Sequence, residues 1–270
     1  MSADDPQIPT ALPSSTVILV RGGESLPQVL MVLRRPGDAF GSNYTFPGGV
    51  LDDDEAEATC HCARRTAENA NAVLGLNTGG LDYYGAAVRE LFEETGVLLA
   101  RDAEGAWALA SESMEQRADE LREQLDAGVL PWKELLRENE LTVACDALHY
   151  FSFWETPVDR PRRWTTRFFL AELPLGREAR IDGRELLNCH WMTAAEVLSA
   201  GDDGGMTLPF PTRATLEKLA EFEKLEDLMR WAGAAASQGI DRILPVSLDE
   251  PGGKRVVLPG DPAYPTDPYS

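Results

Sequence analysis

The sequence predicts an α/β fold, because runs of strand length and segments of helical periodicity follow one another along the chain. Apolar runs of strand length at 16–21 and 28–35, separated by Gly22-Gly23, predict two neighbouring strands. Two further runs at 148–155 and 164–173 predict a second strand pair much later in the chain. Segments with helical periodicity lie between and after these pairs.

Composition narrows the classes of function. The chain has 270 residues, of which 43% are hydrophobic, so it can bury a full core. Its formal net charge of −20 argues against a nucleic-acid backbone or an anionic membrane as a partner. A small anionic substrate stays compatible with this charge, because a bound metal ion reverses the local field.

The expected location is cytoplasmic. The sequence contains no apolar run long enough to span a membrane and no start that resembles a signal peptide. The chain has four cysteines, a usage that fits a reducing compartment: Cys60, Cys62, Cys145 and Cys189.

Three regions are expected along the chain. Residues 1–14 are polar, contain three prolines and are expected to be a flexible N-terminus. Residues 15–240 are expected to form the domain, with insertions at about 56–85 and 102–147. Residues 241–270 are rich in proline and are expected to pack on the domain as a hairpin-like tail.

The helical segments follow from periodicity and capping signals. Thr193 is a predicted N-cap, and Glu196 three residues later completes a capping box. The other expected helices, in order, cover 56–72, 81–91, 107–127, 131–139 and about 210–232.

An acidic helix face is the strongest candidate for chemistry. Glu90, Glu93 and Glu94 stand at i, i+3 and i+4, so a helix places them on one face, where their charges repel. Mg²⁺ or Mn²⁺ relieves such a cluster, whereas the alternative is a solvated acidic surface. Arg89 stands four residues before Glu93 and is expected to hold it, and Gly96 is the expected helix end.

A second motif upstream makes the pattern specific. Phe46-Pro47-Gly48-Gly49, five further residues, Glu55, and then the run from Arg89 to Val97 together resemble the Nudix box of the Nudix hydrolases. The departure is the spacer, because about thirty residues instead of seven separate Glu55 from Arg89. The Nudix hydrolase 19 branch of that family carries an insertion at this point, and residues 50–52 and 86–99 are similar to it.

The resemblance implies a Nudix α/β/α sandwich, with helices on both sides of a mixed sheet and with helical insertions. It also implies hydrolysis of a diphosphate linked to another moiety. The implied metal ligands are Glu90, Glu93 and Glu94, with Glu55 as a fourth across the insertion. Arg89 orients the cluster, and the base that activates water is Glu94 or Glu185. The implied cofactor is Mg²⁺ or Mn²⁺.

Glycines and arginines are the candidates for substrate binding. Gly48 and Gly49 permit a close approach of the backbone to a ligand or metal. Four arginines stand within eight residues of this acidic chain, and arginine suits bidentate phosphate recognition. Arg163 and Arg167 are the better candidates among them for a phosphate contact, and the alternative is salt bridging to acidic loops. Arg35 belongs to an Arg34-Arg35 pair that partly matches the arginine-containing run ahead of Phe46 in coenzyme A-specific relatives.

The resemblance implies coenzyme A or acyl-CoA as the substrate. The runners-up in the same class are ADP-ribose, NADH and nucleoside diphosphate sugars. A different class is a Nudix module that senses a nucleotide without cleaving it. A homodimer is expected by analogy.

Overall fold

A computed structural model describes residues 8–37, 42–58, 61–62, 64–108, 112–181, 183–251 and 253–269, without the side chains of 112–116. In these residues an eight-stranded mixed sheet runs in the order β10-β7-β8-β1-β2-β3, with β4 paired to β1 and β9 paired to β2. The strand bounds are β1 (Leu12–Arg21), β2 (Gln28–Arg34), β3 (Tyr44–Thr45), β4 (Gly48–Val50), β7 (His149–Glu155), β8 (Trp164–Glu172), β9 (Leu186–Thr193) and β10 (Arg242–Ile243). The β1–β8 and β10–β7 pairs are parallel and the others are antiparallel, so the predicted mixed sheet is confirmed.

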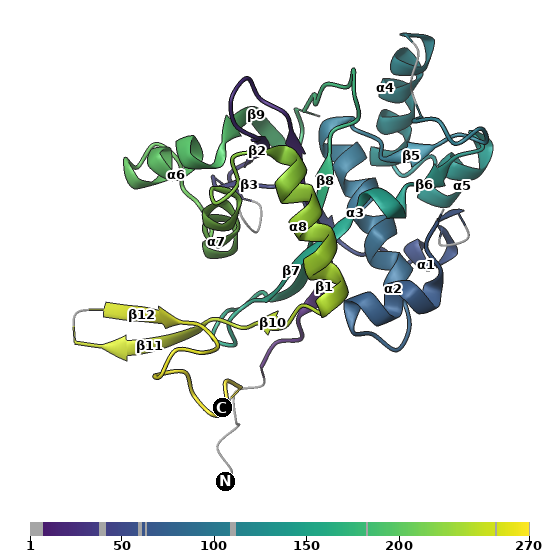
Figure 1. Ribbon diagram of the computed structural model, residues 1–270. Coiled ribbons are helices and arrows are strands. Elements are labelled where there is room, and N and C mark those ends of the chain that lie inside the picture. Colours follow the sequence, from purple (N-terminus) through teal and green to yellow (C-terminus); the bar gives the residue numbers. More distant parts are fainter. Residues whose placement is uncertain are drawn as a thin grey trace.

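Helices cover both faces of this sheet, with α3 on one side and α8 on the other (Figure 1). The helix bounds are α1 (Glu55–Ala58), α2 (Ala67–Leu74), α3 (Gly80–Thr95), α4 (Glu112–Asp126), α5 (Trp132–Glu138), α6 (Ala194–Asp202), α7 (Phe210–Leu219) and α8 (Leu225–Gln238). The central strand β1 shows why two layers form. Val17 and Leu19 pack into the core under α3, whereas Ile18 and Val20 pack into the core under α7 and α8, as the alternation of a strand requires. The predicted α/β sandwich is therefore present.

The segment from 55 to 79 folds as the two helices α1 and α2 beside α3. It replaces the single helix expected over 56–72, and Gly75 ends α2 in the left-handed region at φ 64°. The helix with the acidic face starts at Gly80, so the last part of the expected insertion belongs to α3 itself. The long spacer in the sequence is thus folded against the acidic helix.

The second insertion contains α4 and α5, and a small two-stranded sheet of β5 (Ala100–Arg101) and β6 (Thr142–Val143) joins its two ends. Helix α4 begins later than the expected residue 107. Trp107 instead bridges to Arg101 and lies against its guanidinium, 4.1 Å from the ring centroid. A cation–π contact and a bridge therefore replace the first turn expected for that helix.

The C-terminal third corrects one prediction and confirms two. The helix expected over about 210–232 is two helices, α7 and α8, because residues 220–224 leave the helical path and Lys224 is extended. The capping box of Thr193 and Glu196 is formed. The tail forms the predicted hairpin, from β11 (Val246–Glu250) and β12 (Gly253–Val257), which extends from the body of the molecule (Figure 1). The packing of the tail on the domain stays a prediction. The domain boundaries stay a prediction, although β1 already begins at Leu12. In the described part of the chain, no helix is long and apolar enough to cross a bilayer.

Candidate active site

Helix α3 carries the acidic face to a cavity of about 480 Å³. The helix buries Tyr84, Val88, Leu91 and Phe92 against β1, and this packing fixes its rotation about its own axis. The helix ends at Gly96, as expected. Gly96 has φ 71°, and its backbone N–H donates to Phe92 O at 2.8 Å. We call the space the carboxylate cavity, and its lining is Arg34, Gly48, Gly49, Val50, Asp52, Arg89, Glu90, Glu93, Glu94, Leu125, Asp126, Gly128, Arg184 and Glu185.

Arg89 ties the cluster together from behind. Its Nε donates to Glu55 Oε1 at 2.5 Å, and its Nη1 lies 2.9 Å from Glu93 Oε2 and 3.0 Å from Glu90 Oε1. Its Nη2 donates to the backbone oxygen of Val50 at 3.0 Å. The predicted contact with Glu93 is confirmed, and one buried guanidinium orients three carboxylates and the strand opposite them.

Glu94 is held by a separate set of donors. Its Oε1 accepts from Arg34 Nη2 at 2.6 Å, and its Oε2 accepts from the backbone N–H of Gly48 at 2.9 Å. Arg34 Nη2 also donates to the backbone oxygen of Gly48. The sequence does not reveal this role of Arg34, because it stands sixty residues from Glu94 and no local spacing joins them.

The two glycines make room for the protein's own atoms. Gly48 has φ 153°, in the region that favours glycine, and a Cβ there would overlap the backbone of Ser15 and Thr16 in β1. A Cβ on Gly49 would overlap the carboxylate of Glu90. Strand β4 can therefore approach β1 only with glycine at position 48, whereas a side chain at position 49 would displace the carboxylate of Glu90.

The acidic side chains of this cavity are harder to ionise than ordinary glutamates. Burial raises the pKa of Glu93 to about 8, although Arg89 opposes the rise. Burial raises the pKa of Glu94 to about 8 as well, against the effect of Arg34, and it also raises the pKa of Glu90. The two arginines therefore do not compensate the carboxylates fully, and a further cation would stabilise their ionised forms.

The donor set fits a hard divalent cation. Carboxylate oxygens are the ligands such ions prefer, and Glu90, Glu93 and Glu94 all line the carboxylate cavity. In the described residues, however, no three acidic, histidine or cysteine side chains converge on one point as metal ligands do. The reason is visible in the contacts above, because Glu90 and Glu93 are turned toward Arg89. Metal binding requires their carboxylates to rotate into the cavity.

Glu55 is brought to the cluster but lies on its far side. The residue is 1% exposed and contacts Arg89, and it is absent from the lining of the carboxylate cavity. Burial raises the pKa of Glu55 to about 7, and its Oε2 has no hydrogen-bond partner among the described residues. The structure thus places this predicted ligand behind Arg89, where it faces the guanidinium.

Of the other predicted site residues, one lies at the carboxylate cavity and the rest lie outside it. Glu185 lines the carboxylate cavity, with its Oε2 4.0 Å from Arg34 Nη1 and 66% of its side chain exposed. Arg35 lies outside, where it donates to the backbone oxygens of Gly183 and Arg184 at 2.9 and 2.6 Å.

Arg163 and Arg167 are also outside the cavity, buried in structural contacts. Arg163 pairs with Glu155 at 2.5 Å and donates to the backbone oxygens of Thr156 and Pro9. Arg167 lies between the rings of Tyr83 and Phe153, 4.2 and 4.3 Å from their centroids, and donates to Leu74 O. Neither side chain is directed at the carboxylates, so the phosphate role expected for them has no support in these contacts.

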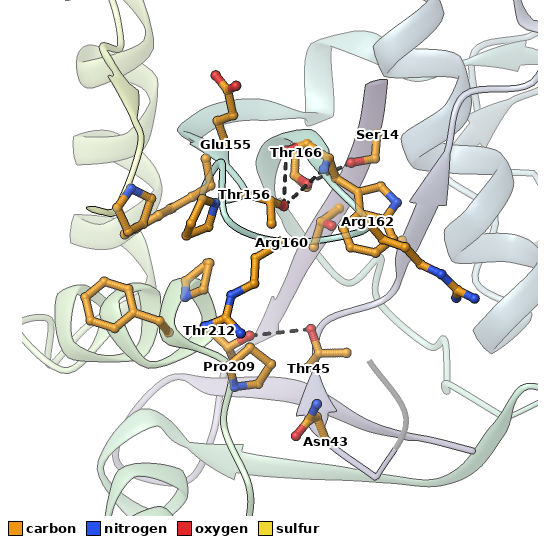
Figure 2. Close-up of a pocket in the computed structure, with 18 of the residues that line it drawn as sticks. Ser14, Asn43, Thr45, Glu155, Thr156, Arg160, Arg162, Thr166, Pro209 and Thr212 are labelled. Carbon is orange, nitrogen blue, oxygen red and sulfur yellow. Dashed lines mark hydrogen bonds between the residues drawn. The ribbon is translucent and has the colours of Figure 1, made fainter. Parts of the chain in front are cut away.

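A second cavity of about 970 Å³ adjoins the first one, and the two share Arg34, Gly48, Gly49 and Val50. We call it the aromatic cavity. Its walls come from β4, the turn between β7 and β8, the start of α7 and the hairpin β11–β12. Figure 2 shows Thr45 and Thr212 on one side of it and Ser14 and Thr166 on another, each pair joined by a hydrogen bond, of 3.4 and 2.7 Å.

Together, the fold and the site define a Nudix-type protein. An insertion splits its Nudix box into two halves, and Arg89 contacts residues of both halves. The family model described as the NUDT19 Nudix domain matches residues 78–219, and the chain belongs to that family.

Curated relatives include acyl-coenzyme A diphosphatases NUDT19 from three vertebrates. The Xenopus laevis protein is 25% identical over 89% of this chain and 72% of its own length. The Gallus gallus protein is 31% identical over 67% of this chain, and the Homo sapiens protein is 30% identical over 66% of it. The chain spans about half the length of these last two, 52% and 49%.

A solved structure supports the fold. The Nudix hydrolase from Alicyclobacillus acidocaldarius superposes with a TM-score of 0.69 over 83% of this chain and 97% of that one, at 24% identity.

Proposed function

We propose that this protein hydrolyses the diphosphate bond of coenzyme A or acyl-CoA in a reaction that depends on Mg²⁺ or Mn²⁺. The observation that carries the proposal is the carboxylate cavity, where Glu90, Glu93 and Glu94 lie in an electrostatically uncompensated cluster beside a larger cavity. The names of the NUDT19 relatives point to the same substrate class.

In this mechanism Glu90, Glu93 and Glu94 would hold the divalent cation, and the substrate diphosphate would bind at the carboxylate cavity. When bound, the cation supplies positive charge that neutralises the diphosphate oxygens as charge develops. Water adds to one phosphorus, the bridging P–O bond breaks, and a carboxylate accepts the proton of the water. Arg89 keeps Glu93 and Glu90 in place, and Arg34 keeps Glu94 in place.

Glu185 is the better supported proton acceptor. Both oxygens of Glu94 already accept hydrogen bonds, from Arg34 and Gly48, whereas the Glu185 side chain is largely exposed at the cavity. The variant Glu185→Gln is expected to lower kcat without changing the metal concentration that gives half-maximal rate. An unchanged kcat would assign the proton to Glu94 instead.

A substrate panel tests the proposal. It contains coenzyme A, an acyl-CoA, ADP-ribose, NADH and a nucleoside diphosphate sugar, each with Mg²⁺, with Mn²⁺ and with EDTA. We expect the highest kcat/KM for coenzyme A or acyl-CoA and no turnover in EDTA. A higher kcat/KM for another compound of the panel would identify that compound as the substrate, with the same mechanism of hydrolysis.

A non-catalytic nucleotide sensor is the second candidate. Tight binding of one panel member without turnover of any would favour it. The uncompensated carboxylates speak against it, because a binder of an anion gains nothing from them. The cytoplasmic location and the homodimer also stay predictions, which cell fractionation and light scattering would test.

A further inference from the structure

The aromatic cavity has a positive lining in a chain of net charge −20. Its charged lining residues are Arg34, Arg160, Arg162 and Glu155. Glu155 is 5% exposed and already compensated by Arg163 at 2.5 Å, Arg242 at 3.1 Å and the Tyr269 hydroxyl at 2.9 Å. The cavity therefore favours an anionic group, although the protein as a whole repels one.

Arg160 is the arginine placed to meet that group. It lies in the turn between β7 and β8, and Figure 2 shows its side chain directed across the cavity, toward the side where Thr212 lies. Its Nε is 3.7 Å from Asp159 Oδ1, beyond hydrogen-bond distance, and Lys254 Nζ also contacts Asp159, at 3.4 Å. Arg34 cannot serve the same purpose, because it is committed to Glu94 and to the backbone of Gly48.

The remaining lining suits a nucleoside. Trp154 and Phe210 meet edge to face with their ring centroids 5.9 Å apart, and Trp164 and Phe168 also line the space. Such rings bind a flat base, and the threonine hydroxyls offer polar contacts to a sugar. Because the carboxylate cavity adjoins at Gly48–Val50, a substrate with its diphosphate over the glutamates has its nucleoside in the aromatic cavity.

We propose that Arg160 binds a phosphate monoester on the ribose of the substrate, outside the diphosphate that is cleaved, and so selects nucleotides that carry this extra phosphate. The inference rests on the proposed function. A planar guanidinium forms two parallel hydrogen bonds to phosphate, and a terminal monoester offers the oxygens for both. Arg160 is thus a specificity determinant for the nucleoside end of the substrate, and it has no contact with the reacting phosphorus.

Matched substrate pairs test this role. Coenzyme A and 3′-dephospho-coenzyme A differ only in a ribose 3′-phosphate, and NADPH and NADH differ only in a ribose 2′-phosphate. For Arg160→Gln we expect kcat/KM to fall roughly 10- to 100-fold for the phosphorylated member of the selected pair, mainly through KM, as the loss of a charged hydrogen bond requires. The dephosphorylated member should change less than about twofold. Arg160→Lys, which keeps the charge and loses the planar fork, should recover part of the loss.

The control is Arg230→Gln, because Arg230 is an exposed arginine of α8 that lines neither cavity. It should leave both members of each pair unchanged. An equal loss for both members in Arg160→Gln, or no loss for either, would overturn the proposal. Selection within the coenzyme A pair would identify a 3′-phosphate as the bound group, and selection within the NADPH pair would identify a 2′-phosphate.

A binding measurement separates this inference from the proposed function. Calorimetry with the wild-type protein compares 3′,5′-ADP with 5′-AMP, and also 2′,5′-ADP, none of which contains a bond to hydrolyse. We expect one bisphosphate to bind at least about tenfold more tightly than 5′-AMP and Arg160→Gln to remove the difference. Equal affinities for all three in the wild type would refute the role of Arg160 even in an active enzyme. Selective binding without turnover would refute only the hydrolase.

Discussion

Glu55 and Arg89 form a buried ion pair, with 2.5 Å between Glu55 Oε1 and Arg89 Nε, across 34 positions of sequence. The segment inserted between them folds as α1 and α2 beside α3 and so returns Glu55 to the helix. The two halves of the box are therefore joined through Arg89, and the long spacer does not separate them in space.

This pair predicts that Glu55 positions Arg89 and does not bind the metal. Glu55→Gln keeps an acceptor for Nε but removes the charge, so kcat is expected to fall roughly tenfold while the metal concentration for half-maximal rate shifts less than about threefold. Mg²⁺ and Mn²⁺ titrations of the initial rate measure both values. Glu93→Gln in the same titrations is the comparison. If the metal concentration for half-maximal rate shifted as much in Glu55→Gln as in Glu93→Gln, Glu55 would be a metal ligand.

Gly49 predicts a loss of activity that leaves the fold intact. A methyl group in Gly49→Ala would displace the carboxylate of Glu90, the mobile end of a side chain, so stability should fall by less than about 1 kcal/mol. The turnover rate should fall roughly 10- to 100-fold, because Glu90 leaves its place at the cavity. Gly22→Ala is the matched control, since a Cβ at Gly22 meets nothing within 4 Å. Wild-type rates in Gly49→Ala would show that the position of Glu90 is unimportant.

Arg163 should affect stability more than substrate binding. Arg163→Ala leaves the buried Glu155 with Arg242 and Tyr269 as its charged or hydroxyl partners among the described residues. We therefore expect a loss of at least roughly 2 kcal/mol in stability, below the 3–5 kcal/mol of a fully orphaned charge. Thermal unfolding should shift down by about 5 °C, and KM should change less than about twofold. A higher KM with unchanged stability would restore Arg163 as a phosphate ligand.

The metal-free protein should lose stability as the pH rises. The pKa values of Glu93 and Glu94 are about 8 in the folded state, and both lie well above the 4.5 of an unperturbed glutamate. Between about pH 4.5 and about pH 8, the folded protein holds protons that the unfolded chain has released. The free energy of unfolding is therefore highest at the acidic end of this range and falls as the pH rises to about 8.

In EDTA, the unfolding temperature is therefore expected to be several degrees lower at about pH 8.5 than at about pH 6. Millimolar Mg²⁺ should raise it, and more strongly at the higher pH, where the cation displaces fewer protons. Glu93→Gln should flatten the dependence measured in EDTA. The same slope in wild type with and without Mg²⁺ would contradict a cation site among these carboxylates.

The sequence predicts the acidic face, its end at Gly96 and the contact between Arg89 and Glu93, because all three depend on the local geometry of one helix. It also predicts the strands of the core and the capping box at Thr193. These features need no knowledge of tertiary contacts.

Features that depend on tertiary contacts do not follow from the sequence. The role of Arg34 requires that β2 end opposite α3, and the burial of Arg163 and Arg167 requires partners from distant segments. Arginines clustered in sequence are equally suited to phosphate and to buried carboxylates or aromatic rings. The break between α7 and α8 falls in a run without glycine or proline, so no local signal marks it.

The most direct measurement is the rate of coenzyme A hydrolysis by Glu93→Gln and Glu94→Gln across a titration of Mg²⁺, with folding checked by circular dichroism. The three-glutamate site predicts that each variant loses at least about 100-fold in kcat/KM at a metal concentration that saturates the wild type, while circular dichroism stays unchanged. Wild-type hydrolysis by either variant at that Mg²⁺ concentration would contradict the assignment of the acidic face of α3 as the metal site of a diphosphate hydrolase.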